Sequence, residues 1–121
     1  MAVLGEPNKK QLNTYSILKT IHERTISYVR PDRKASEVWE YCHNLMKYFN
    51  VAHPIPEGTM IGHSIGINVH EEPMILKNNE RRIHENMVIV IEPVIGKEFF
   101  IIQDHIVVGK SGSKKMSNKF N

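Results

Sequence analysis

The stretch ENMVIVIEPVIGKEFFIIQDHIVV, residues 85–108, decides the fold. It holds two runs, 87–95 and 98–108, that are rich in β-branched and aromatic residues, and such runs predict β-strands. Gly96 and Lys97 separate the runs, and a two-residue loop with glycine first favours a type II′ turn. The stretch therefore predicts an antiparallel hairpin.

Two polar residues stand inside these apolar strands. Counting outward from the turn places Val90 opposite Gln103 and Glu92 opposite Ile101, so Glu92 and Gln103 project from one face as diagonal neighbours. A bulge at Pro93 would shift this register by one residue. A buried carboxylate is costly without a partner, so Glu92 either faces solvent at a strand end or binds a cation or hydrogen-bond donors.

Upstream of the hairpin, the apolar residues change from extended to helical spacing. Residues 65–70 predict a further strand, and the Pro- and Gly-containing segment 50–60 predicts a loop. Helices are predicted over 8–29, ending before Pro31, and over 36–49, with Ser36 as the N-cap. The expected fold is α+β, with two helices packed on a small antiparallel sheet of about three strands.

Composition and charge limit the function classes. A chain of 121 residues with net charge +3 predicts one domain, and its single Cys42 excludes a Cys-rich zinc module. The chain lacks an apolar run of about 20 residues and a signal-peptide pattern, so we expect a cytoplasmic protein without a membrane partner. Much of the positive charge lies in residues 110–121, which predict a basic flexible tail more readily than a nucleic-acid-binding arm.

A candidate metal site comes from the stretch GHSIGINVHEEP, residues 62–73. His63 and His70 bracket it, and together with Glu92 they offer nitrogen and oxygen ligands for one borderline divalent metal. A single histidine near a strand is more often a structural residue than a ligand. On spacing alone, both readings stay open.

Several ordered motifs resemble the pita-bread metallopeptidases, the family of methionine aminopeptidase, Xaa-Pro dipeptidase and creatinase. They are GHSIGINVHEEPMI, ENMVIVIEPVI and FFIIQDHIVV, preceded by LGEPNKKQLNTYSILKTIHERTISYVRPDRKASEVWEY. The resemblance covers residues 1–109 and is closest in style to Xaa-Pro dipeptidase. It implies that these residues form the C-terminal half of the catalytic domain.

The resemblance also implies roles for four residues. The family residue matching His63 is a metal ligand, and the one matching His70 contacts the substrate and the tetrahedral intermediate. The residue matching Glu92 is a metal ligand and general acid or base. In the family's last motif, Arg-x-Glu-Asp, Ile101 replaces the arginine and Gln103 replaces a glutamate that bridges two metals.

The total charge of the candidate metal ligands determines whether we expect peptidase activity. The family holds two divalent ions (Mn, Co or Zn) with two aspartates and two glutamates, whereas residues 1–121 match only Glu92 of these four. The negative charge of the ligands would then fall far short of balancing two ions about 3.5 to 4 Å apart. We expect no two-metal cofactor, at most a single weak ion, and no peptidase activity of the chain alone.

Three functional hypotheses follow. The first is a degenerate, truncated relative in which His63, His70, Glu92 and Gln103 are vestigial. The second is a subunit of a split Xaa-Pro metallopeptidase completed by another chain, and the third is a peptide- or protein-binding pseudopeptidase module. Because half of the fold would leave a sheet edge and apolar surface open, we expect a homodimer or a partner chain.

Overall fold

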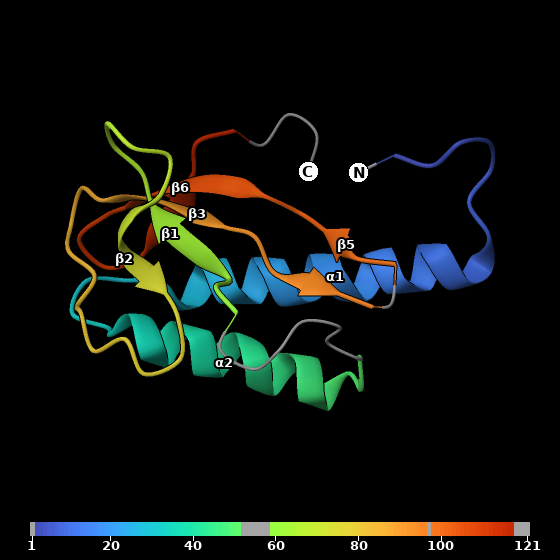
Figure 1. Ribbon diagram of the computed structural model, residues 1–121, viewed down its shortest axis with the longest axis horizontal. Coiled ribbons are helices and arrows are strands. Elements are labelled where there is room, and N and C mark those ends of the chain that lie inside the picture. Colours follow the sequence, from blue (N-terminus) through green and yellow to red (C-terminus); the bar gives the residue numbers. More distant parts are fainter. Residues whose placement is uncertain (1, 52–58, 97, 118–121) are drawn as a thin grey trace.

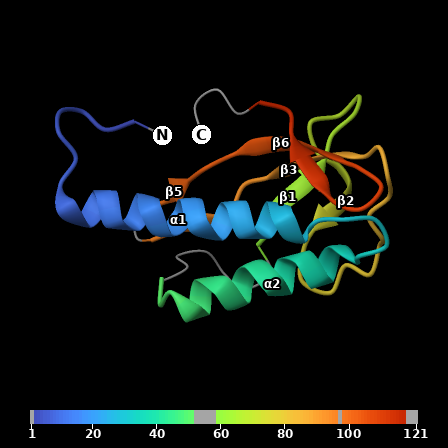
Figure 2. The same cartoon turned by 180° about the vertical axis from the view of Figure 1, so that it is seen from behind.

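Two helices cover one side of an antiparallel sheet in the computed structural model, which describes residues 2–51, 59–96 and 98–117. The helices α1 (Lys9–Tyr28) and α2 (Ala35–Tyr48) lie next to each other along the long axis of the molecule (Figure 1). Seen from behind, α1 crosses in front of the strands and α2 lies below α1 (Figure 2). This architecture confirms the predicted α+β class.

The ends of α1 follow from its sequence. Asn8 is the N-cap, its side chain accepts from the Gln11 backbone N–H at 2.8 Å, and Gln11 accepts in return from the Asn8 N–H at 2.9 Å. This capping box satisfies two of the free N–H groups of the first turn. At the other end the C-cap Val29 is extended, two residues before Pro31. The predicted helix 8–29 is thereby confirmed.

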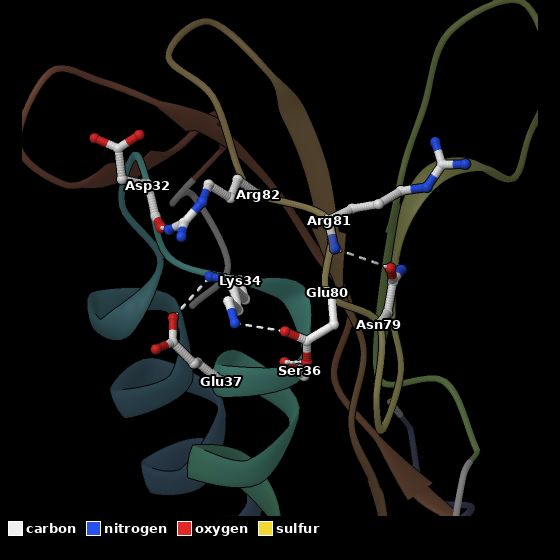
Figure 3. Close-up of polar contacts among 8 residues, drawn as sticks. All are labelled: Asp32, Lys34, Ser36, Glu37, Asn79, Glu80, Arg81 and Arg82. Atoms are coloured by element: carbon white, nitrogen blue, oxygen red, sulfur yellow. Dashed lines mark hydrogen bonds and ion pairs between the residues drawn. The ribbon is translucent and has the colours of Figure 1, made fainter.

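The start of α2 differs by one feature from the prediction. Lys34, and not Ser36, is the N-cap, and its backbone N–H donates to Glu37 at 2.7 Å. The Ser36 hydroxyl instead donates to Glu80, which also accepts from the Lys34 ammonium (Figure 3). The hydrogen bond from Lys34 lowers the pKa of Glu80. The backbone of α2 is tied to the same segment, because the Ala35 N–H donates to the carbonyl of Arg81 at 2.9 Å.

Five strands form the main sheet in the order β2-β1-β3-β6-β7, and every neighbouring pair is antiparallel. The short strands β4 and β5 form a separate pair that continues from β3 and leads into β6. The bounds are β1 Gly62–Ser64, β2 Glu71–Ile75, β3 Val88–Ile91, β4 Val94–Ile95, β5 Phe100–Ile101, β6 Asp104–Val108 and β7 Ser113–Lys115. The described part of the chain thus has more strands than the three expected, because short strands give little periodicity.

The strand predicted over 65–70 is wrong. Strand β1 ends at Ser64 and β2 begins at Glu71, and the connection folds back on Glu71, whose carboxylate accepts from the Asn68 N–H at 2.9 Å. Its apolar side chains Ile67 and Val69 are exposed. Their alternation therefore did not reflect a buried sheet face.

The predicted two-residue turn and its register are also wrong. Ile95 pairs with Phe100, so the connection spans residues 96–99, of which Lys97 lies outside the described residues. Gly96 and Phe99 both adopt positive φ, 75° and 56°, and the Phe99 N–H donates to the Gly96 carbonyl at 3.3 Å. The longer turn shifts the pairing by two residues.

The β3–β6 and β4–β5 pairs keep one register, so no bulge at Pro93 shifts the pairing. Val90 faces His105 and Val94 faces Ile101. Continuing this register places Glu92 directly opposite Gln103 instead of diagonal to it. Opposite residues share a face, so the two side chains start from the same side of the sheet.

The segment expected to be a flexible basic tail contains strand β7. Ser113–Lys115 pairs with the edge of β6, and the Ser113 hydroxyl donates to the carbonyl of Ile26 in α1 at 2.6 Å. The Lys115 ammonium lies 3.4 Å from Asp104. Residues 118–121 of the predicted tail lie outside the described residues. The positive charge and the small residues of this segment gave no sign of an edge strand.

The hydrophobic core lies between the helices and the sheet. It joins apolar side chains of α1 and α2 to those that β2, β3 and β6 direct toward the helices, including Leu18, Ile21, Val38, Cys42, Ile75, Ile89, Ile91 and Ile106. Burial raises the pKa of the Cys42 thiol to about 12. In the parts of the chain that the structure describes, neither helix is long and apolar enough to cross a membrane.

Candidate metal centre

The structure brings together three of the four predicted site residues. His63 lies in β1, His70 ends the connection before β2, and Glu92 follows β3 directly. Their ligand atoms all lie within 4.8 Å of one another, and His63 is buried, Glu92 half-buried and His70 exposed. Residues about 30 positions apart in the sequence thus form one cluster because β1 and β3 are neighbours in the sheet.

His63 presents its Nε2 atom to Glu92. Its Nδ1 atom lies 3.0 Å from the carbonyl of Ser64, and because a carbonyl oxygen only accepts, Nδ1 carries the hydrogen. In the neutral ring Nε2 then carries a lone pair, and it lies 3.3 Å from Oε1 of Glu92. A divalent ion between these two atoms, or a proton on Nε2, would satisfy both of them.

The spacing of these two atoms suits a tetrahedral ion. Ligands about 2.0 to 2.2 Å from zinc at tetrahedral angles are about 3.4 Å apart. A hydrogen bond from Nδ1–H to a carbonyl is also the usual way in which a ligating imidazole is oriented. The His70 ring packs edge-on against His63 at 4.4 Å between centroids, close enough to act as a third ligand or to contact a bound substrate. The donor set fits one borderline divalent ion.

Backbone contacts fix the positions of both ligands. The Glu92 N–H donates to the carbonyl of Ile61 at 2.8 Å, which ties the residue after β3 to the residue before β1. The next residue after Ile61 is Gly62, where an added Cβ would meet the Val90 carbonyl oxygen at 2.3 Å. The close approach of β1 to β3 at Gly62 therefore sets the distance from His63 to Glu92.

Gln103, the fourth predicted residue, begins opposite Glu92 and is exposed. It lines a surface hollow of about 720 Å³, together with Ile65, Gly66, Val88, Asp104, His105, Met116 and Ser117. Its amide is neutral, so it adds an oxygen donor without adding charge. Ile101, in the place expected for an arginine, is partly exposed.

Sequence reasoning missed two histidines near the centre. His105 is two residues beyond Gln103 in a strand, so its place on the same face was available from period-two alternation. His22 lies on the buried stripe of α1, where its Nε2 atom is 3.1 Å from the carbonyl of Ile91. Desolvation by burial lowers the pKa of His22, against the opposing effects of that hydrogen bond and of Asp104.

Known proteins match nearly the whole length of this chain. The profile of metallopeptidase family M24 matches residues 1–113. The Xaa-Pro dipeptidase of Pyrococcus horikoshii is 32% identical over 124 residues, covering 95% of this chain and 33% of the relative. The chain therefore spans about a third of the length of this curated relative.

Solved structures show the same fold. The prolidase of Pyrococcus furiosus superposes with a TM-score of 0.87 at 27% identity, covering 99% of this chain and 36% of that chain. Methionine aminopeptidase of Rickettsia prowazekii gives a TM-score of 0.74 at 19% identity, covering 92% of this chain and 54% of that chain. The second likeness is one of fold alone.

Proposed function

Because this chain belongs to metallopeptidase family M24, we propose that it forms the histidine-rich part of an Xaa-Pro dipeptidase-like metal site. In this proposal His63 and Glu92 hold one divalent ion, and His70 is a third ligand or a substrate contact. The observation that carries it is the 3.3 Å separation between His63 Nε2 and Glu92 Oε1, with the His63 ring already oriented by Ser64.

Each residue has a chemical task in this proposal. A bound divalent ion would supply Lewis-acid polarisation of a peptide carbonyl or a bound water. His63 and Glu92 orient that ion, and the Glu92 carboxylate is also placed to accept a proton from the attacking water. The exposed ring of His70 is placed to donate a hydrogen bond to the oxygen of a tetrahedral intermediate.

We further propose that residues 1–121 by themselves do not hydrolyse peptides. A second ion beside the first needs carboxylates that bridge the pair, and Gln103 offers a neutral amide at the position opposite Glu92. One carboxylate cannot balance two divalent ions in a partly dry site. The site residues of this chain then bind a single ion weakly and are vestigial for catalysis unless another polypeptide adds carboxylates.

Metal analysis and a peptidase assay on one preparation test this proposal. After incubation with Mn²⁺, Co²⁺ or Zn²⁺ and brief desalting, we expect at most one equivalent of metal per chain. Hydrolysis of an Xaa-Pro dipeptide should be absent with or without added metal. Two tightly held equivalents, or turnover that disappears in the His63→Gln protein, would show that the chain is a working peptidase.

A peptide-binding module is the second candidate function. The hollow of about 720 Å³ beside Gln103 has the size of a small-ligand site, and its lining combines apolar Ile65, Val88 and Met116 with polar Gln103 and His105. Calorimetry with Xaa-Pro peptides decides this candidate. Binding without cleavage that is lost in His105→Ala would support it, and equal binding by both proteins would exclude this hollow.

A partner chain is the last part of the proposal. Apolar side chains are exposed around the start of the chain and β5, namely Val3, Leu4, Leu12, Phe99 and Ile101. Strand β5 pairs only with β4 among the described residues, so its other edge is open to a further strand. We propose that a second copy, or a chain carrying the remaining part of the family fold, covers this surface. A cytoplasmic location stays a prediction.

A further inference from the structure

Histidine 22 lies under the candidate metal centre, on the helix side of the sheet. Its side chain is 1% exposed, and it reaches from α1 to the strands β3 and β6. Because a carbonyl oxygen only accepts, the 3.1 Å contact with Ile91 means that His22 Nε2 carries the hydrogen. The other ring nitrogen, Nδ1, lies 3.6 Å from Oδ2 of Asp104, which also lies 3.4 Å from the Lys115 ammonium.

The two residues that His22 contacts form a pair. Ile91 and Asp104 face each other as the last pair of the β3–β6 ladder, before the strands separate and resume as β4 and β5. The next residue on each strand is a site residue, Glu92 after Ile91 and Gln103 before Asp104. His22 therefore hydrogen-bonds to β3 at the last pair of this ladder, one residue before Glu92.

A purely structural role explains this choice of residue poorly. Burying an imidazole removes it from water and costs free energy that a leucine of similar size would not cost. Ile91 and Asp104 lie at an end of the ladder, where strand ends fray most easily. A directional hydrogen bond restrains the position of the Ile91 carbonyl in a way that apolar packing does not.

We propose that His22 is a positioning residue for the metal centre, holding the Ile91 carbonyl in place so that the next residue, Glu92, points to the site. The effect of His22 on metal binding rests on the proposed metal-binding function, whereas its contact with the Ile91 carbonyl does not. His22 restrains the residue before Glu92, and the Ile61 carbonyl accepts a hydrogen bond from the Glu92 N–H.

A matched pair of variants tests the proposal. The amide of His22→Gln reaches far enough to donate to the Ile91 carbonyl, whereas the shorter His22→Asn does not, and both are neutral. Ile21→Val, a buried change on the same helix, controls for loss of stability. The first readout is amide hydrogen exchange in the metal-free protein, as the rate at Glu92 relative to Val108, whose N–H donates to Met87 at the other end of the ladder.

We expect the Glu92 rate ratio to rise about tenfold or more in His22→Asn and less than about threefold in His22→Gln and Ile21→Val. Equal ratios in the three variants would overturn the proposal, since a general loss of packing moves all amides together. If His22→Asn does not fold, ring ¹⁵N spectra of the unmodified protein decide. An Nε2–H tautomer supports the proposal, and an Nδ1–H tautomer, which cannot donate to Ile91, overturns it.

Binding of Co²⁺ is the second readout. If the metal proposal holds, His22→Asn should bind Co²⁺ about tenfold more weakly than His22→Gln. Unchanged affinity would limit His22 to the metal-free fold and overturn its role at the centre. If the unmodified protein binds no Co²⁺, the proposed function fails, and the exchange ratios still decide whether His22 positions Glu92.

Discussion

Replacing Gln103 by glutamate adds the carboxylate that the candidate centre lacks. Residue 103 starts directly opposite Glu92, so the two carboxylates would lie about 5 Å apart. With the screening of bulk water, which is the lower limit for a half-buried site, their repulsion costs about 0.8 kcal/mol in the metal-free protein. The same screening gives a divalent ion about 4 Å from the new carboxylate an extra attraction of about 2 kcal/mol.

Gln103→Glu should therefore be slightly less stable without metal and should bind Zn²⁺ about thirtyfold more tightly. Urea unfolding measures the first effect, and calorimetric titration measures the second. Asn13→Glu, which adds the same charge on the exposed face of α1, is the matched control for the titration and should leave the Zn²⁺ affinity unchanged. Unchanged Zn²⁺ affinity in Gln103→Glu would refute the placement of residue 103 beside the ion.

Three further predictions concern the scaffold. Gly62→Ala should lose about 2 kcal/mol or more of unfolding free energy in urea, because its Cβ would meet the Val90 carbonyl at 2.3 Å. Gly112→Ala, which has open space around it, should lose little. Equal losses in the two variants would contradict this account of β1. Burial lowers the pKa of His22 in the folded state, so its contribution to stability is complete above the unfolded pKa of about 6.5 and is lost as the pH falls below it. The unfolding free energy should fall less steeply from pH 7 to 5 in His22→Gln, and parallel profiles would rule this out. Light scattering should report a dimer of the 14.0 kDa chain that Ile101→Asp weakens, and a concentration-independent monomer would argue against the proposed partner surface.

The helices were predictable because their signals are local. Asn8 with Gln11 forms a capping box, and Pro31 prevents the first helix from continuing. The turn after Ile95 was not predictable, because Phe99 takes a positive φ that the sequence gives no reason to expect. Strand β7 was missed for a related reason. Its three residues form the edge of the sheet and carry almost no periodic pattern.

The residues of the candidate site were predictable from the sequence, but the residues that hold them in position were not. His63, His70 and Glu92 stand in recognisable motifs, and neighbouring strands bring them together. The role of Gly62 depends on how closely β3 approaches, and that of His22 on a contact between residues 69 positions apart. Contacts of this kind arise only when the helix packs on the sheet, so a local pattern cannot reveal them.

Cobalt(II) absorption is the most direct test of the central claim that His63 and Glu92 hold one divalent ion. Titrating Co²⁺ into the protein should give visible d–d bands that follow a one-site binding curve, with the intensity of a tetrahedral or five-coordinate site. The bands should be lost in His63→Gln and Glu92→Gln and kept in His84→Gln, which removes an exposed histidine outside the cluster. Bands that survive both site substitutions, or that saturate at two equivalents, would contradict the account.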